Sequence, residues 1–464
     1  MNRDGIKSMT QTKLKVLSLF SGGMGLDLGL EASGHFEVVA CVELDHAACE
    51  TIRFNQSKGR LPSSLRLYEG DITELDPLNL LRDLRLDPGE IDVIAGGPPC
   101  QSFSTAGKRG TVQDVRGTLL WQFLKFVQEI QPKFFLMENV RGLLSAALKH
   151  RPIANRPEKG GPPLAIDELP GSVVEEFVKD LRGSKGAKYH MDCFEVNSVN
   201  YGAPQIRERV LFIGNRFNEQ VEIPNPTHGA GKINSSQQLL LFNDEPELKT
   251  TIPWRTLGDA IRGLDDKNPE VLDFSPRKKE FLAMVPPGGN WRCLPIEVQK
   301  ESMKKAWEAK GGRSGWWRRL SYDFPCPTLV TMPNHASTSL CHPEQVRALS
   351  LREYAAIQEF PVDWEFSGST AEKYRQVGNA VPVRLGKVAG NTIASALHAL
   401  AGRDFKPISE APRPYRIVYV QSHIRTRSWF KDGKAVSGNA ADSGAISYSS
   451  PKTGRKTSKV METF

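Results

Sequence analysis

The chain has 464 residues, 39% of them hydrophobic, which is long enough for two domains with sizeable cores. It has no apolar run of about 18 residues and no basic and apolar leader, which argues against a membrane or secreted protein, so we expect a cytoplasmic one. The net charge is +8, and residues 403–464 hold 12 Lys and Arg against 5 Asp and Glu. Such a basic surplus suits a polyanion partner.

The seven cysteines form no Cys-x-x-Cys pair and no cluster with histidine. This spacing argues against a structural zinc site and against a disulfide framework. We therefore expect free thiols and no bound metal.

Residues 14–214 alternate strand-like apolar runs with stretches of helical periodicity. The clearest predicted strands are 16–20, 38–42, 91–95, 134–137 and 210–213, and the clearest helix is 120–130. This alternation predicts an α/β fold with a doubly wound, mostly parallel sheet. In such a sheet the ligand binds beyond the carboxyl ends of the strands.

The rest of the chain divides by composition. Residues 151–171 are rich in Pro and Gly and predict a loop insertion at the surface. Residues 215–341 lose the alternation and predict a second, smaller, irregular domain, after which helical periodicity at 342–402 predicts a return to the first domain. We expect the basic tail 403–464 to be partly disordered, with 415–420 and 423–430 ordered against nucleic acid.

Three successive strand ends carry features of a nucleotide site. A glycine-rich turn at residues 20–25 opens a helix, as in nicotinamide, flavin and methyl-donor enzymes, although some such corners need glycine only for packing. Glu43 follows about twenty residues later, where a carboxylate accepts both ribose hydroxyls, while Asp45 suits a helix N-cap. Asp71 and Ile72 would offer a carboxylate and an apolar side chain to adenine. Together they predict an adenosine-containing ligand.

The tripeptide Pro98-Pro99-Cys100 follows another predicted strand. Two prolines fix φ and remove two backbone donors, so the loop is stiff enough to hold a thiolate in one geometry. The sequence therefore favours a cysteine nucleophile, and the alternative is a turn whose cysteine only packs.

Several motifs occur together and in order, namely the glycine turn, Glu43, Asp71, Pro-Cys-Gln at 99–101, Glu-Asn-Val at 138–140, Gln-x-Arg-x-Arg at 205–209 and Gln-Val-Gly-Asn-Ala-Val-Pro at 376–382. On these motifs the chain resembles the DNA (cytosine-5) methyltransferases of bacterial restriction-modification systems, over about residues 14–400. The resemblance implies a Rossmann-like S-adenosylmethionine-binding catalytic domain, a target-recognition domain at 215–341 and a final helix that returns to the catalytic domain. Met24 departs from the family, which usually has glycine there, and implies a different turn conformation that still binds the cofactor.

The resemblance implies transfer of a methyl group from S-adenosylmethionine to carbon 5 of a flipped cytosine in a specific duplex DNA sequence. Cys100 would add to carbon 6 and Glu138 would act as the acid at ring nitrogen 3. Of Arg207 and Arg209, the latter would contact the base carbonyl and the former a DNA phosphate, although two Arg at this spacing also suit a solvated strand face. The implied cofactor-binding residues are Phe20, Gly22, Gly25, Glu43, Leu44, Asp71, Ile72, Pro99, Leu119, Asn379 and Val381, and the expected DNA-binding residues are Gln101, Ser102, Ser104, Arg318 and Arg319.

Other interpretations remain open at this point. A related branch methylates cytosine in transfer RNA but has a much shorter recognition region, and a non-catalytic DNA-binding regulator would have lost Cys100, Glu138 or the Arg pair. The stretches 316–319 and 328–339 suit a protein core or scaffold as well as DNA contacts. We expect the protein to be a monomer. A cognate restriction endonuclease would act on the same DNA sequence without binding this protein directly.

Overall fold

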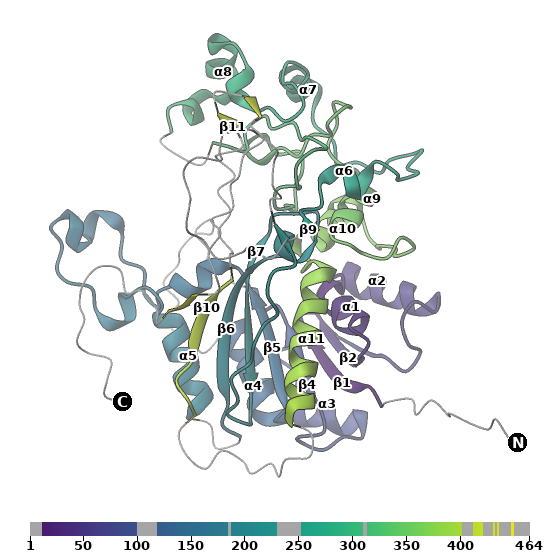
Figure 1. Ribbon diagram of the computed structural model, residues 1–464, viewed down its shortest axis with the longest axis vertical. Coiled ribbons are helices and arrows are strands. Elements are labelled where there is room, and N and C mark those ends of the chain that lie inside the picture. Colours follow the sequence, from purple (N-terminus) through teal and green to yellow (C-terminus); the bar gives the residue numbers. More distant parts are fainter. Residues whose placement is uncertain are drawn as a thin grey trace, which may run out of the picture.

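The computed structural model describes residues 12–99, 118–183, 187–229, 252–309, 313–400 and 412–420, and the backbone of three short strands within 430–449. It has the predicted α/β architecture. Figure 1 shows the sheet in the lower part of the molecule and an irregular region, which carries α7 and α8, above it. No helix in these ranges is long and apolar enough to cross a membrane.

The centre of the fold is a nine-stranded sheet with the order β13-β10-β6-β7-β5-β4-β1-β2-β3. Neighbours pair in parallel except that β7 is antiparallel to β5 and β6, and β13 to β10. The strands of this sheet are β1 Leu14–Leu19, β2 Phe36–Glu43, β3 Arg66–Glu69, β4 Val93–Gly96, β5 Phe134–Asn139, β6 His190–Asn197, β7 Glu208–Asn215, β10 Arg416–Tyr419 and β13 Ser447–Ser449. The strand order reverses between β1 and β4, and this switch point is where open α/β sheets bind their ligands.

Helices cover both faces of the sheet, and shorter helices lie within the irregular upper region. The α-helices are α1 Gly25–Ala32, α2 His46–Ser57, α3 Pro77–Leu84, α4 Leu119–Ile130, α5 Ser172–Arg182, α6 Leu257–Ile261, α7 Pro276–Ala283, α8 Ile296–Met303, α9 Leu351–Ile357, α10 Thr370–Asn379 and α11 Val383–Leu400. Two two-stranded pairs complete the described elements, β8 His228–Gly229 with β9 Ile252–Pro253, and β11 Phe430–Lys431 with β12 Lys434–Ala435. Residues 151–171 hold only 3₁₀ turns, Ile153–Asn155, Pro157–Lys159 and Ile166–Glu168.

The two faces of the sheet build two cores, because successive side chains of a strand point to opposite sides. Val16 and Val93 pack with side chains of α1, α2 and α11, whereas Leu17 and Ile94 pack with those of α3, α4 and α5. Both faces of β1 and β4 are therefore buried, which explains the continuous apolar runs at 16–20 and 91–95.

The last long helix lies against the first, although more than 350 residues separate them in sequence. A Cβ at Gly386 in α11 would stand 2.5 Å from Leu26 O in α1, so only glycine permits this backbone approach. The helical periodicity at 342–402 thus leads back to the central sheet (Figure 1).

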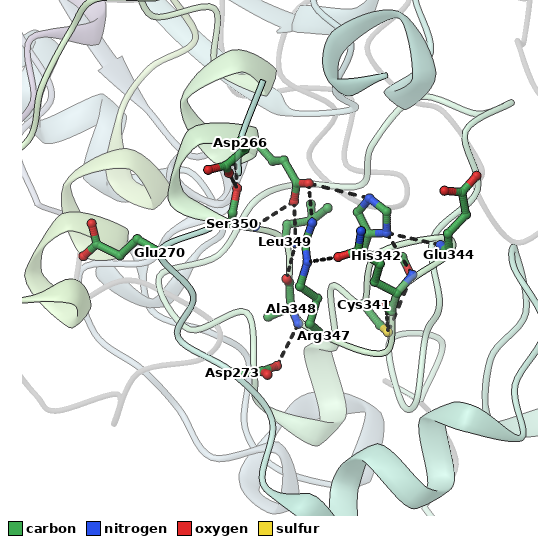
Figure 2. A network of polar contacts seen from close by, with 12 residues as sticks. Asp266, Glu270, Asp273, Cys341, His342, Glu344, Arg347, Ala348, Leu349 and Ser350 are labelled. Carbon is green, nitrogen blue, oxygen red and sulfur yellow. Dashed lines mark hydrogen bonds and ion pairs between the residues drawn. The ribbon is translucent and has the colours of Figure 1, made fainter. Parts of the chain in front are cut away.

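The upper region has its own hydrophobic cluster. Its buried members are Phe274, Phe281, Leu282, Val285, Trp291, Leu294, Met303, Trp317, Cys341 and Ala348. Figure 2 shows the polar network that ties this region to α9. Arg347 donates to both carboxylate oxygens of Glu353, at 2.9 and 2.7 Å, and the same carboxylate accepts from Ser350 N at 2.7 Å.

Residues 415–420 differ from the sequence expectation. Arg416–Tyr419 form β10, which pairs with β6 instead of facing nucleic acid. Arg416 Nε lies 2.7 Å from Asp192 Oδ1, and this carboxylate is fully buried in β6. A buried carboxylate needs a cation, and β6 needs a partner strand, so this part of the basic tail belongs to the sheet.

Candidate active site

The turn that follows β1 has a strained backbone. Phe20, Gly22 and Met24 all have positive φ, at 57°, 52° and 66°. Met24 N donates to Ser21 O at 2.8 Å, and the Met24 side chain is fully buried in the core. Met24 therefore adopts the left-handed conformation, which the glycine usual in the family would adopt without strain. For Met24 this conformation costs about 1–2 kcal/mol, and the packing of its side chain in the core stabilises it.

Gly25 is required by packing. A Cβ at this position would overlap the carbonyl oxygen of Val381 and approach Ala380 Cβ to 3.2 Å. The turn after β1 is thus in contact with the chain that follows α10. Asn379 ends α10 and is exposed, whereas Val381 is buried.

Glu43 supports the glycine turn from the end of β2. Its Oε2 accepts from Gly22 N at 2.6 Å, and its Oε1 accepts from Leu44 N and Asp45 N at 2.9 and 2.8 Å. Burial raises the pKa of Glu43, and these three backbone donors oppose that shift. Asp45 is the N-cap of α2 and accepts from Ala48 N at 3.1 Å, as its alternative interpretation predicted.

The next strand end gives a mixed result. Asp71 Oδ1 accepts from both Thr73 N and Thr73 Oγ1 at 2.8 Å, and these bonds lower the pKa of Asp71. Ile72 is 4% exposed and packs in the core, whereas Leu44 is 65% exposed. The open apolar side chain at this edge is therefore Leu44, and the part of Ile72 in ligand binding remains a prediction.

Asp27 is a titratable group beneath the turn that the sequence did not single out. It is 1% exposed, and burial raises its pKa to about 7. A hydrogen bond with Ser18 opposes the shift. The floor of the glycine turn therefore holds a carboxyl group that titrates near neutral pH.

Glu138 and Arg209 form the polar centre at the neighbouring strand ends. Glu138 lies near the carboxyl end of β5, is 8% exposed, and its Oε1 is 2.6 Å from Arg209 Nε in β7. Arg209 Nη1 also donates to Glu208 O at 2.7 Å. A buried acid is thus paired with a cation on the antiparallel neighbour.

The loop after β4 lies beside this pair. A Cβ at Gly97 would be 3.3 Å from Glu138 Oε2, and Asn139 Nδ2 donates to Pro98 O at 3.0 Å. Asn139 was quoted in the Glu-Asn-Val motif without a role, and this bond supplies one. Pro99 is exposed and is the last described residue before Cys100.

Some predicted site residues lie outside the described ranges, namely Cys100, Gln101, Ser102 and Ser104. Leu119 is the first residue of α4 and is half-buried. Since β1, β4 and β5 are parallel neighbours, the glycine turn, the 97–99 loop and Glu138 all lie at one edge of the sheet.

Arg207 is a correction to the sequence analysis. Its side chain is 1% exposed, with Nη1 donating to Leu329 O at 3.0 Å and Nη2 to Gly378 O at 2.8 Å. Burial lowers the pKa of this guanidinium well below its ordinary value, and the neighbouring Arg209 adds to the shift. Arg207 therefore holds backbone carbonyls and is not placed to contact a DNA phosphate.

Arg318 and Arg319 hold parts of the upper region together. Arg318 Nε donates to Ser339 O at 3.2 Å. Arg319 donates from all three of its guanidinium nitrogens, to Pro343 O, Val285 O and Glu344 O. These bonds fit the scaffold interpretation, but both residues are only half-buried, and their contact with DNA stays a prediction.

Within the described ranges no group of three His, Cys, Asp or Glu side chains is arranged to hold a metal ion. The described cysteines form no disulfide. Cys49 lies in α2, and burial raises the pKa of its thiol to about 12.

Comparison with known proteins identifies the family. The family model for C-5 cytosine-specific DNA methylase matches residues 14–395, which include every element described for the site. The chain belongs to this family. It is therefore a C-5 cytosine DNA methyltransferase, an enzyme that acts on DNA.

Similar proteins agree with this assignment. The chain is 37% identical to the Type II methyltransferase M.Sau96I of Staphylococcus aureus over 82% of this chain and 76% of that protein. It is 36% identical to the Type II methyltransferase M.Eco47II of Escherichia coli, over 84% and 80%. A crystal structure described as a prophage-encoded DNA modification methyltransferase of E. coli aligns with a TM-score of 0.52 and 26% identity, covering 83% of this chain and all of that one.

Proposed function

We propose that this enzyme transfers a methyl group from S-adenosylmethionine to carbon 5 of a flipped cytosine in a specific duplex DNA sequence, through a covalent bond from Cys100 to carbon 6. The observation that carries the proposal is the Glu138–Arg209 pair, 2.6 Å apart, beside the loop that leads to Cys100. Relatives named Type II methyltransferases support a role in protecting host DNA in a restriction-modification system. The enzyme would act in the cytoplasm as a monomer, without binding a cognate endonuclease directly.

The proposed chemistry uses the buried acid. Addition of the Cys100 thiolate to carbon 6 breaks the aromaticity of the ring and makes carbon 5 an enamine-like nucleophile. Glu138 gives its proton to ring nitrogen 3, where the added electron pair accumulates, and Arg209 orients Glu138 and reaches the base carbonyl. After carbon 5 is methylated, its proton is lost to a base and the carbon–sulfur bond breaks, which frees Cys100 as a thiolate. The proton on ring nitrogen 3 returns to Glu138, so the aromatic ring and the acid are both restored.

The cofactor half of the site fits an adenosine. A carboxylate has about four acceptor positions, and Glu43 uses three of them on the backbone of residues 22, 44 and 45. One position on Oε2 is left for a ribose hydroxyl, next to the exposed Leu44 side chain, which suits an adenine face. When bound there, S-adenosylmethionine supplies an electrophilic methyl group on a sulfonium.

The test is transfer of a tritiated methyl group to unmethylated plasmid DNA, followed by nucleoside analysis. Label should appear in 5-methylcytosine, and Cys100→Ala should abolish it. Glu138→Gln, which keeps the shape of the side chain but has no proton to give, should slow transfer by about 10²–10⁴-fold with little change in DNA affinity. Cys293→Ala, which removes a thiol from the upper region, is the matched control and should leave the rate unchanged.

The proposal fails if label appears in adenine, or if Cys100→Ala labels cytosine at the rate of the unaltered enzyme. Labelling of transfer RNA in preference to DNA would favour the RNA-methylating branch instead.

A further inference from the structure

One short stretch of chain lies between the glycine turn and the upper region. Residues 377–381, the end of α10 and the turn after it, meet the glycine turn through Val381 O and Gly25. On the other side, a Cβ at Gly378 would stand 2.8 Å from Val330 O and 2.9 Å from Thr331 N. The stretch 377–381 therefore contacts both the cofactor half of the site and residues 326–331, which we call the recognition segment.

Gln358 and Gln205 fix this arrangement from the interior. Both side chains are fully buried. Gln358 Nε2 donates to Val377 O at 2.7 Å and Ala380 O at 3.0 Å, and its Oε1 accepts from Gln205 Nε2 at 2.9 Å. Gln205 Oε1 in turn accepts from Leu329 N at 2.9 Å. Two amides thus connect the backbone of 377–381 to the backbone of the recognition segment.

Arg207 makes the same connection a second time. Its guanidinium donates to Leu329 O at 3.0 Å and to Gly378 O at 2.8 Å. Both backbone groups of Leu329 are therefore held, the N–H by Gln205 and the carbonyl by Arg207. The side chains of Gln205 and Arg207 are buried, so each bond that opens leaves a buried polar group unpaired.

The recognition segment is also attached directly to residues 204–206. Cys326 N donates to Pro204 O at 2.8 Å, Ile206 N donates to Cys326 O at 2.8 Å, and Thr328 Oγ1 donates to Ile206 O at 2.8 Å. A displacement of the recognition segment must therefore move Gln205 and Arg207, and with them the stretch 377–381. Packed interiors transmit such displacements because they have few voids to absorb them.

We propose that Gln205, Arg207 and Gln358 are positioning residues that couple DNA binding by the upper region to cofactor binding at the glycine turn. The inference rests on the proposed function, which gives the two sites their ligands. A displacement of the recognition segment on DNA binding moves 377–381 through these bonds, and 377–381 contacts the turn at Gly25. Because coupling between two binding sites is reciprocal, bound cofactor must tighten DNA binding by the same factor.

The experiment measures the dissociation constant of S-adenosylhomocysteine, the product left after methyl transfer, by titration calorimetry with and without unmethylated plasmid DNA fragments. The ratio of the two constants is the coupling factor. Gln358→Leu removes the amide that bridges the two sides at nearly constant volume. Gly378→Ala keeps every side chain of the network but inserts a methyl group between 377–381 and the recognition segment. Tyr189→Phe is the matched control, since it deletes a buried hydrogen bond to Pro132 O, 2.6 Å long, that lies outside this network.

In the unaltered enzyme and in Tyr189→Phe, DNA should tighten product binding by about fivefold or more. In Gln358→Leu and in Gly378→Ala the factor should fall below about twofold, with binding of the product alone retained. Equal coupling factors in all four proteins would overturn the inference while leaving the proposed function intact. Absence of product binding in the unaltered enzyme would instead reject the proposed function, and this inference with it.

Discussion

Replacement of Arg207 by Met separates the structural role of this side chain from the role that its motif suggests. The substitution leaves Leu329 O and Gly378 O without their donors, and these bonds are 3.0 and 2.8 Å long. An unpaired buried polar group costs about 1–3 kcal/mol. The apolar Met side chain avoids the cost of burying a cation, which offsets part of this loss. We therefore expect the free energy of unfolding to fall by about 2–4 kcal/mol.

Two assays on the same protein distinguish the two roles. Urea denaturation followed by tryptophan fluorescence should show the loss of stability, whereas Arg277→Met, which removes an exposed cation of α7, should change the free energy of unfolding by less than about 0.5 kcal/mol. The salt dependence of DNA binding should keep its slope in Arg207→Met, because this guanidinium is buried and donates to two backbone carbonyls. The reasoning is refuted if the stability is unchanged and the slope of log K against log salt falls by about 0.9, the value for one lost phosphate contact.

Three further changes test other parts of the structure. Gly25→Ala should weaken binding of S-adenosylmethionine by at least about tenfold, because the new methyl group overlaps the carbonyl oxygen of Val381. Gly263→Ala places its methyl group in open space and should bind the cofactor normally. Equal affinities of the two variants in calorimetry would contradict the packing argument. Burial raises the pKa of Asp27 to about 7, so the folded protein holds this proton more tightly than the unfolded chain does. The resulting contribution to stability is lost as the pH rises from about 4 to 7. Asp27→Asn should flatten that part of the plot of unfolding free energy against pH, and an unchanged plot would show that the carboxyl is ionised throughout. Arg347→Met should cost about 3–5 kcal/mol because it takes the guanidinium away from the buried Glu353 carboxylate. A loss below about 1 kcal/mol in urea denaturation would show that water reaches the network of Figure 2.

The sequence predicted the parts of the fold that local patterns encode. The apolar runs at 16–20, 38–42 and 134–137 became β1, β2 and β5, because a strand buried on both faces is apolar along its whole length. Glu43 was singled out by its spacing from the glycine turn and Glu138 by the family resemblance. Each lies near the carboxyl end of its strand, at the expected edge of the sheet.

Long-range pairing explains the features that the sequence analysis missed. The run that forms β6 was not among the predicted strands because it carries His190, Asp192 and Glu195, and the cation that makes Asp192 tolerable inside the sheet is Arg416, which lies 224 residues further along the chain. Arg207 likewise finds its acceptors at residues 329 and 378, so no local pattern could show that it is buried. Polar residues in a core are specified by their partners, and the partners here are far apart in sequence.

The most direct test of the central claim is covalent capture of the reaction at Cys100. Duplex DNA synthesised with 5-fluorocytosine in place of cytosine should stop the reaction after methyl transfer, because fluorine cannot leave as a cation and the carbon–sulfur bond then persists. With S-adenosylmethionine present, we predict a complex that survives denaturing electrophoresis, and mass spectrometry of its peptides should place the modified nucleotide on Cys100. Ordinary DNA should leave no such complex. The account is contradicted if the fluorinated DNA is bound but not captured, or if the attachment maps to any other residue.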